Sequence, residues 1–324
     1  MKRFDLVKRI ALGAALAAFA VFLAVYPLVR AGMQSAWIEK RLHGVSFLVE
    51  KTGLESGEVD LRAAADGAFD FLGKCLGRDP AELLPPDLVV ILAYGGYAGV
   101  TLSDEFLERS LRAKNRALSV RLVESLKSRF APNEPFSSSR GIKGERMILA
   151  DLYEAERNGD PLSAVLVHAL SDFMLSYNAP PATLAAIEPG AGYSPAAMRR
   201  FYLFGEFFSL YLAERSVFGG DPAADVADPD IARRLRERVA ARYDPAGALL
   251  GEDNLRARYT AERAELGALV RNHRLALDLA ESRGEGGLVA VFRDAAAGAY
   301  SFPEELVARL GLDPALLFAP APNP

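Results

Sequence analysis

A histidine and an aspartate lie four residues apart in the apolar segment 166–175. This spacing places His168 and Asp172 on one face of a helix. There, the carboxylate could orient the imidazole as a general base, or the two side chains could supply half of a metal site. Two residues complete neither role, so we favour a structural interpretation in which Asp172 satisfies a partly buried His168.

A second candidate is Glu206, which lies in the segment 201–211, where six of eleven residues are aromatic. If this segment is a buried helix, desolvation raises the affinity of the carboxylate for a proton, as in a general acid. A buried glutamate paired with Arg199 or Arg200 of the same helix has the same appearance in the sequence. We favour this second interpretation, because clustered aromatic residues are more often core than ligand cage.

The third candidate is the loop 137–146, which contains Arg140, Lys143 and Arg146 and precedes a predicted helix. Free amides at a helix start, together with these cations, could bind a phosphate or a carboxylate. The loop lacks the GxxxxGK[ST] spacing of a P-loop, and Glu145 places a negative charge where the anion would sit. A solvated hinge is therefore favoured.

Established catalytic and cofactor motifs are missing from the chain. The sequence has no HExxH, CxxC, CxxCH, GxSxG or strand-linked GxGxxG motif, so it predicts no cofactor and no metal. Enzymatic chemistry would require His168, Asp172 and Glu206 to converge in one cleft as base, orienting group and acid.

These residues must be positioned by helices, because apolar residues recur at helical spacing along most of the chain. We predict an all-α fold of roughly eight to ten helices after an N-terminal transmembrane helix. The predicted helices are 37–49, 61–76, 88–102, 103–130, 145–157, 161–177, 195–215, 229–243, 254–283 and 302–310. A buried strand at 88–93 is an alternative, and 288–292 could form a lone strand.

Local signals mark the boundaries of some of these elements. Asp160 and Ser194 each precede a proline, which indicates a capped helix that begins with proline. The proline- and glycine-containing segment 131–144 separates two predicted helical subdomains, 34–130 and 145–318. Residues 319–324 carry too little apolar surface to fold and form a predicted disordered tail.

The N-terminus carries the strongest signal. A basic tail, residues 1–9, precedes the uncharged segment 10–29. A helix of about 20 apolar residues spans the hydrocarbon core of a bilayer. The apolar segment of a cleaved signal peptide is shorter, at about 7–15 residues. The sequence therefore predicts a retained signal anchor, with secretion after cleavage near Ala31 as the alternative.

Charge gives the expected orientation and excludes some partners. Lys and Arg number four before the span and three close after it, a slight bias toward a cytoplasmic N-terminus. Residues 1–32 hold five of the 38 basic and one of the 42 acidic residues, so the remainder has a formal charge of −8. Such a domain has no electrostatic reason to bind nucleic acid or anionic lipid. The single Cys75 excludes an intramolecular disulfide.

Two functions of different class follow from these features. The first is a non-enzymatic interaction or assembly module of the cell envelope, single-pass in the cytoplasmic membrane with an extracytoplasmic domain and a protein partner. The second is an envelope hydrolase that uses Glu206, His168 and Asp172. The sequence leaves substrate and oligomeric state open.

Overall fold

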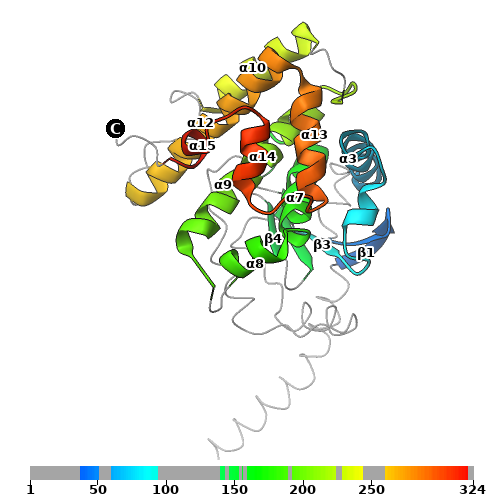
Figure 1. Ribbon diagram of the computed structural model, residues 1–324. Coiled ribbons are helices and arrows are strands. Elements are labelled where there is room, and N and C mark those ends of the chain that lie inside the picture. Colours follow the sequence, from blue (N-terminus) through cyan, green and yellow to red (C-terminus); the bar gives the residue numbers. More distant parts are fainter. Residues whose placement is uncertain are drawn as a thin grey trace, which may run out of the picture.

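Helices stacked on one mixed β-sheet make up the part of the chain that the computed structural model describes (Figure 1). That part comprises residues 37–50, 60–93, 139–142, 146–152, 155, 159–188, 192–223, 228–243 and 260–319. The predominance of helix confirms the main expectation from sequence. The sheet was not expected.

The sheet has five strands in the order β1-β2-β3-β5-β4. Their bounds are β1 Trp37–Leu42, β2 Val45–Glu50, β3 Val89–Ala93, β4 Ser139–Ile142 and β5 Met147–Asp151. The three central strands are parallel, with Phe47 beside Val90 and Val90 beside Ile148. The two edge strands, β1 and β4, are antiparallel to their neighbours.

Both faces of the central strands are buried. Phe47, Val90 and Ile148 belong to the main hydrophobic core, on the face that the helices cover. On the opposite face, Val89 and Met147 are buried as well. A strand buried on both faces is apolar at every position and lacks alternation, so its sequence resembles that of a buried helix.

This ambiguity explains two wrong predictions. The predicted helix 145–157 contains strand β5. In the segment predicted as helix 88–102, residues 89–93 form strand β3, which agrees with the alternative prediction of a strand at 88–93. The predicted helix 37–49 is instead the β1–β2 hairpin. Its turn residues His43 and Gly44 have φ values of 49° and 75°, the paired positive angles of a tight hairpin turn.

The helices follow their sequence signals more closely. They are α3 Leu61–Leu76, α7 Leu162–Tyr177, α8 Pro181–Ile187, α9 Pro195–Ser216, α10 Pro229–Tyr243, α12 Thr260–Arg283, α13 Glu285–Ala296, α14 Pro303–Arg309 and α15 Pro314–Phe318, with a short 3₁₀ helix at Pro80–Leu83. The Ser194 side chain caps α9 by accepting from the amide of Ala197, as predicted. Asp160 is not the cap of α7, since Pro161 occupies that position.

The predicted lone strand 288–292 is wrong, because these residues belong to α13. Gly284, with a φ of 85°, separates α12 from α13. Leu288 and Phe292 are four residues apart and share one helical face, which is buried in the core. Packing of this face therefore overrides the strand preference of the valines in the segment.

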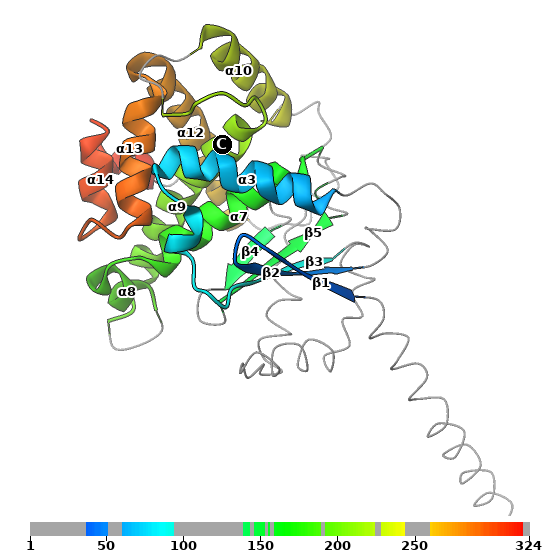
Figure 2. The ribbon, with the colours of Figure 1, turned by 90° about the vertical axis from the view of Figure 1, so that its right-hand side faces the viewer.

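The helices form successive layers above the sheet. Figure 2 shows α3 and α7 crossing one face of the sheet, and α7 contacts β4 and β5 directly. On its other side α7 packs against α9, which in turn contacts α12 and α10. Because α7 is enclosed by helices and strands, its residues from Ala164 to Leu175 are buried with the one exception of Asp172. The sheet and the core both contain residues from each side of the segment 131–144.

No helix among the described residues has the length and the apolar character needed to cross a bilayer. The predicted tail 1–9 and span 10–29 lie outside the described residues, as do the predicted helix 103–130 and residues 320–324.

Candidate functional site

The three residues predicted as catalytic converge where α7 packs against α9. His168 Nε2 lies 3.1 Å from Glu206 Oε2. Asp172 is one turn further along α7 and lies against α9 at Gly205, where an added Cβ would be 3.0 Å from Asp172 Oδ1. The glycine therefore allows close approach of the two helices at this point.

The pair is sealed from solvent. The side chains of His168 and Glu206 keep only 6% and 10% of their surface, so little of either is accessible in this conformation. The nearby hydroxyls are also occupied: Ser171 donates to the His168 carbonyl at 3.0 Å, and Ser209 donates to the Gly205 carbonyl at 2.9 Å. Both hydroxyl protons are thus used within the serines' own helices.

The arginines proposed as structural partners of Glu206 bind elsewhere. Arg200 lies 3.4 Å from Glu304 of α14, and Arg199 donates to the carbonyl of Phe318 at 3.0 Å. The structural interpretation of a buried, paired glutamate agrees with this geometry. Its partner is His168 on a different helix.

The predicted anion loop takes a different form. Residues 139–142 and 147–151 form antiparallel strands, so the segment directly after the loop is a strand and not the predicted helix. Arg146 is exposed, and its Nη1 lies 2.9 and 3.1 Å from the two carboxylate oxygens of Asp87, which raises its pKa. The side chains of Arg140 and Lys143 lie outside the described residues, so the anion site stays a prediction.

A second buried polar cluster joins α9 to the start of α13. Glu285 accepts from Arg215 Nε at 2.7 and 2.9 Å and from the Tyr211 hydroxyl at 3.0 Å. The side chains of Arg215 and Glu285 are 3% and 7% exposed. Burial and the neighbouring Glu285 raise the pKa of Tyr211 well above its ordinary value, so the phenol stays neutral and donates.

A third ionic contact ties α10 to α9. Arg238 binds the carboxylate of Glu214 through Nε and lies 3.5 Å from Asp160 through Nη2. Both carboxylate side chains are fully buried, whereas Arg238 keeps 26% of its side-chain surface. Buried carboxylates persist only with such partners. Helix α9 is thus joined to α7 by the His168–Glu206 contact and to α13 and α10 by ion pairs.

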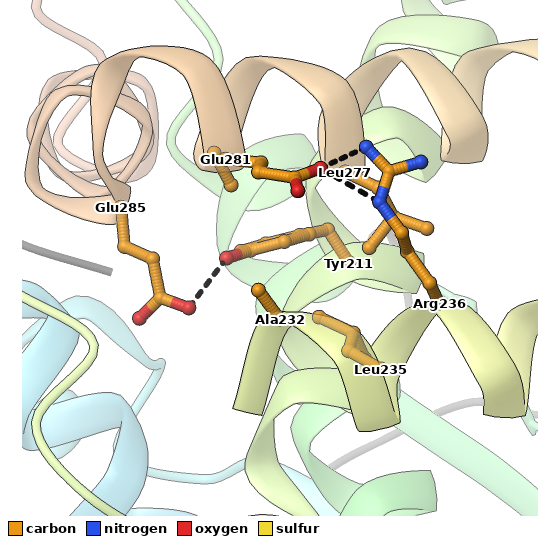
Figure 3. A pocket seen from close by; sticks show the side chains of 8 residues that line it. Tyr211, Ala232, Leu235, Arg236, Leu277, Glu281 and Glu285 are labelled. Carbon is orange, nitrogen blue, oxygen red and sulfur yellow. Dashed lines mark hydrogen bonds and ion pairs between the residues drawn. The ribbon is translucent and has the colours of Figure 1, made fainter. Parts of the chain in front are cut away.

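A pocket lies beside the second cluster, enclosed by α9, α10, α12 and α13 (Figure 3). It encloses about 250 Å³ including its open mouth, and is narrow enough that a water-sized molecule nearly fills its interior. Its lining consists of Tyr211, Ala232, Leu235, Arg236, Leu277, Ala280, Glu281 and Glu285. Figure 3 shows the Tyr211 hydroxyl directed at Glu285, with the Arg236–Glu281 pair at the other end.

Sequence reasoning missed the Tyr211–Arg215–Glu285 cluster. Seventy residues separate Arg215 from Glu285, and no spacing rule connects positions so far apart. The available signal was the presence of ionisable residues in a predicted core helix, which had drawn attention to Glu206 alone.

Metal ligation and similarity to known proteins add no further assignment. Within the described ranges, no group of three or more His, Cys, Asp and Glu residues could hold a metal ion. No protein-family model, curated protein or solved structure matches the chain.

Proposed function

We propose that the chain is a membrane-held, non-enzymatic module that binds a protein partner in the cell envelope. The observation that carries this proposal is the burial of the residues best suited to chemistry. His168 and Glu206 are paired at 3.1 Å with 6% and 10% of their side chains exposed. Their role in this arrangement is to hold α7 against α9.

The buried ion pairs of α9 support the same role. Removing one partner of a buried ion pair costs about 3–5 kcal/mol, because the remaining charge is left without compensation. The Arg215–Glu285 pair and the Arg238 contacts with Glu214 and Asp160 thus fix the neighbours of α9 in place. A fixed helical body is suited to presenting a constant surface to a partner.

The position of the sheet supports a role close to the membrane. Residues 30–36 connect the predicted span to Trp37, where β1 begins. At about 3.5 Å per residue they extend at most about 25 Å, which holds the folded domain near the bilayer. With a formal charge of −8, this domain is repelled by anionic lipid, so a protein surface is the better partner.

Complementation tests the proposal against enzymatic use of the sealed pair. A strain that lacks the chain would be supplied with Glu206→Gln, which removes the carboxylate charge and keeps its shape, or with Glu304→Gln as a control at a half-exposed position. We expect Glu206→Gln to restore wild-type behaviour to the strain, in proportion to the amount of folded protein in the membrane. A variant that is present at the normal level and fails to complement would overturn the proposal.

The second candidate function is the envelope hydrolase. The observation in its favour is that His168, Asp172 and Glu206, chosen from sequence alone, lie together at one helix contact. It requires α7 and α9 to separate, so that substrate can reach the imidazole. His168→Ala decides between the two, because an inactive variant of unchanged stability indicates catalysis and a destabilised one indicates a structural role.

Compartment and anchoring need direct tests. Reporter fusions at the C-terminus, one active outside and one inside the cytoplasmic membrane, determine on which side the domain lies. Extraction of membranes without detergent determines whether the full chain is retained. An outward domain and retention are expected for a signal anchor, whereas release of a shortened chain indicates a cleaved signal peptide.

A further inference from the structure

Helix α15 is held against α9 and α12 through the carbonyls of its own backbone (Figure 1). Arg199 of α9 donates to the Phe318 carbonyl at 3.0 Å. From α12, Asn272 Nδ2 and Arg271 Nη2 donate to the Leu317 carbonyl at 3.1 and 3.2 Å. Contacts with carbonyls do not depend on the side chains of the bound segment, so they are suited to recognising a backbone.

Two apolar side chains anchor α15 beside these donors. Leu317 is fully buried in the main core, and Phe318 packs against a small cluster that α9 and α12 form. The docking surface of α15 therefore consists of Arg199, Leu203, Ala268, Leu269, Arg271 and Asn272. Leu316, by contrast, is 55% exposed. A helix of five residues is unstable by itself in water, so the docking surface holds α15 in its helical form.

Asn272 uses only one side of its amide in this contact. The residue is fully buried, and its Oδ1 meets no hydrogen-bond donor among the described residues. The orientation of the amide is fixed, because the Leu317 carbonyl must face the Nδ2 donor. A buried acceptor without a donor costs stability, and native structures contain few of them. The oxygen of Asn272 thus indicates that the docking surface is completed by a donor that α15 does not supply.

The backbone conformation of the bound segment decides whether that donor is present. In a helix each N–H points along the axis to a carbonyl of the preceding turn, as the Ala319 amide does to Ala315 at 2.9 Å. In an extended segment the N–H and C=O of one residue point to the same side. One extended residue can therefore meet both the oxygen and the nitrogen of the Asn272 amide.

We propose that α9 and α12 form a peptide-binding surface, that α15 covers it, and that its ligand is an extended, apolar segment of a partner protein. Departure of α15 vacates the space that Leu317 and Phe318 occupy, and the carbonyls of the incoming segment replace those of α15. The inference deepens the proposed function, because it names the part of the partner that binds. It rests on that function for the ligand being a protein.

The charge of the docking surface disfavours a basic ligand. Burial and the neighbouring charge of Arg199 lower the pKa of Arg271, so two cations lie close together there. Their charge strengthens the hydrogen bonds that they donate to carbonyls. A neutral or acidic segment is therefore the better ligand.

Two neighbouring leucines of α15 give a matched test. Leu317→Ala removes the buried anchor, whereas Leu316→Ala makes the same change at an exposed position. The probe is a fluorescein-labelled pentapeptide with blocked ends, Thr-Leu-Phe-Val-Thr, and its binding to the full chain in detergent is followed by fluorescence anisotropy. Because α15 competes with the peptide, Leu317→Ala should bind it at least about tenfold more tightly than the unaltered chain, and Leu316→Ala no more tightly.

The hydrogen bond to Asn272 has its own controls. An analogue of the peptide that is N-methylated at Leu and Phe keeps the apolar side chains and lacks the N–H donors. It should bind Leu317→Ala at least about tenfold more weakly than the unmethylated peptide. Adding Asn272→Leu to Leu317→Ala should remove this difference between the two peptides, because the acceptor is then gone.

Binding to Leu317→Ala no tighter than to the unaltered chain, or equal binding of the two peptides, overturns the proposal. If Leu317→Ala fails to fold, Asp313→Ala takes its place, because it removes only the cap of α15, which accepts from the Ala315 amide at 2.9 Å. This variant should strengthen binding about fivefold, and no gain in it overturns the proposal.

The occupant and the proposed function are distinguished separately. A dimer of Leu317→Ala that binds no peptide, measured by size-exclusion chromatography, would identify α15 of a second copy as the occupant and overturns the proposal of a partner protein. The complementation test with Glu206→Gln involves no residue of α15. Its failure therefore counts against the proposed function, and failure of peptide binding counts against the docking surface.

Discussion

The buried Arg215–Glu285 pair gives the sharpest test of how α13 is held to α9. We consider Arg215→Met, which keeps an unbranched apolar stem and removes the guanidinium. The side chains of the pair are 3% and 7% exposed, so Glu285 would remain buried with the Tyr211 hydroxyl as its remaining described donor. A buried charge that loses its partner costs about 3–5 kcal/mol of unfolding free energy.

An exposed ion pair supplies the matched control. Arg309 binds Asp294 with side chains 49% and 38% exposed, and it joins α14 to α13. The same substitution, Arg309→Met, should cost no more than about 1 kcal/mol, because solvent screens the exposed charges. The two variants differ in burial and share their chemistry, so the difference between them measures the effect of burial.

A double-mutant cycle completes the design. Replacing both Arg215 and Glu285 by methionine leaves no charge unpaired, so the double variant should recover most of the stability that Arg215→Met loses. The assay is urea unfolding of the full chain in detergent, followed by the circular dichroism of the helices. A loss below about 1 kcal/mol in Arg215→Met, or a double variant that is no more stable than the single one, refutes the reasoning.

Further predictions concern pH and glycine. Burial raises the pKa of Cys75 from its ordinary 9.0 and that of Tyr211 from 10.0, so the unfolded chain loses these protons first. The stability that these two groups contribute should therefore be fully present below about pH 9 and fall as the pH rises further, by up to about 1.4 kcal/mol per pH unit for each group. Cys75→Ala should remove the part of this fall that begins near pH 9. Gly298 has a φ of 69°, and a Cβ there would overlap the Asn178 carbonyl, so Gly298→Ala should cost about 2 kcal/mol or more in the same unfolding assay. Gly287 lies in α13 with open space around it, so Gly287→Ala should instead stabilise by about 0.5–1 kcal/mol, and a loss there would contradict the helix assignment.

The sequence by itself determined the helices that carry local signals. Helix α9 begins at Ser194 and Pro195 because a hydroxyl cap and a proline at the first helical position act within one turn. Asp60 caps α3 in the same way, through the amide of Ala63. Such contacts involve near neighbours in the chain, so they can be read without knowing the fold.

The tertiary structure decided which of the apolar segments are strands. In β3 and β5 nearly every described side chain is apolar and buried, because the strands pair with each other across more than fifty residues and are covered on both faces. A continuous apolar run has no period of two, so it does not distinguish a strand from a core helix. The reverse error occurred at Leu288 and Phe292, which form part of a helix because their shared face packs in the core.

The same distinction separates the two polar clusters. His168, Asp172 and Glu206 could be chosen from sequence because each is an ionisable residue within an apolar helix, a placement that requires a partner. Which partner each residue meets depended on the crossing of α7 and α9. Arg215 and Glu285 lie at helix ends, where charged residues are ordinary, so only the packing of α13 against α9 revealed that they are buried together. Local physical chemistry acts over a few residues of the chain, whereas burial is a property of the assembled fold.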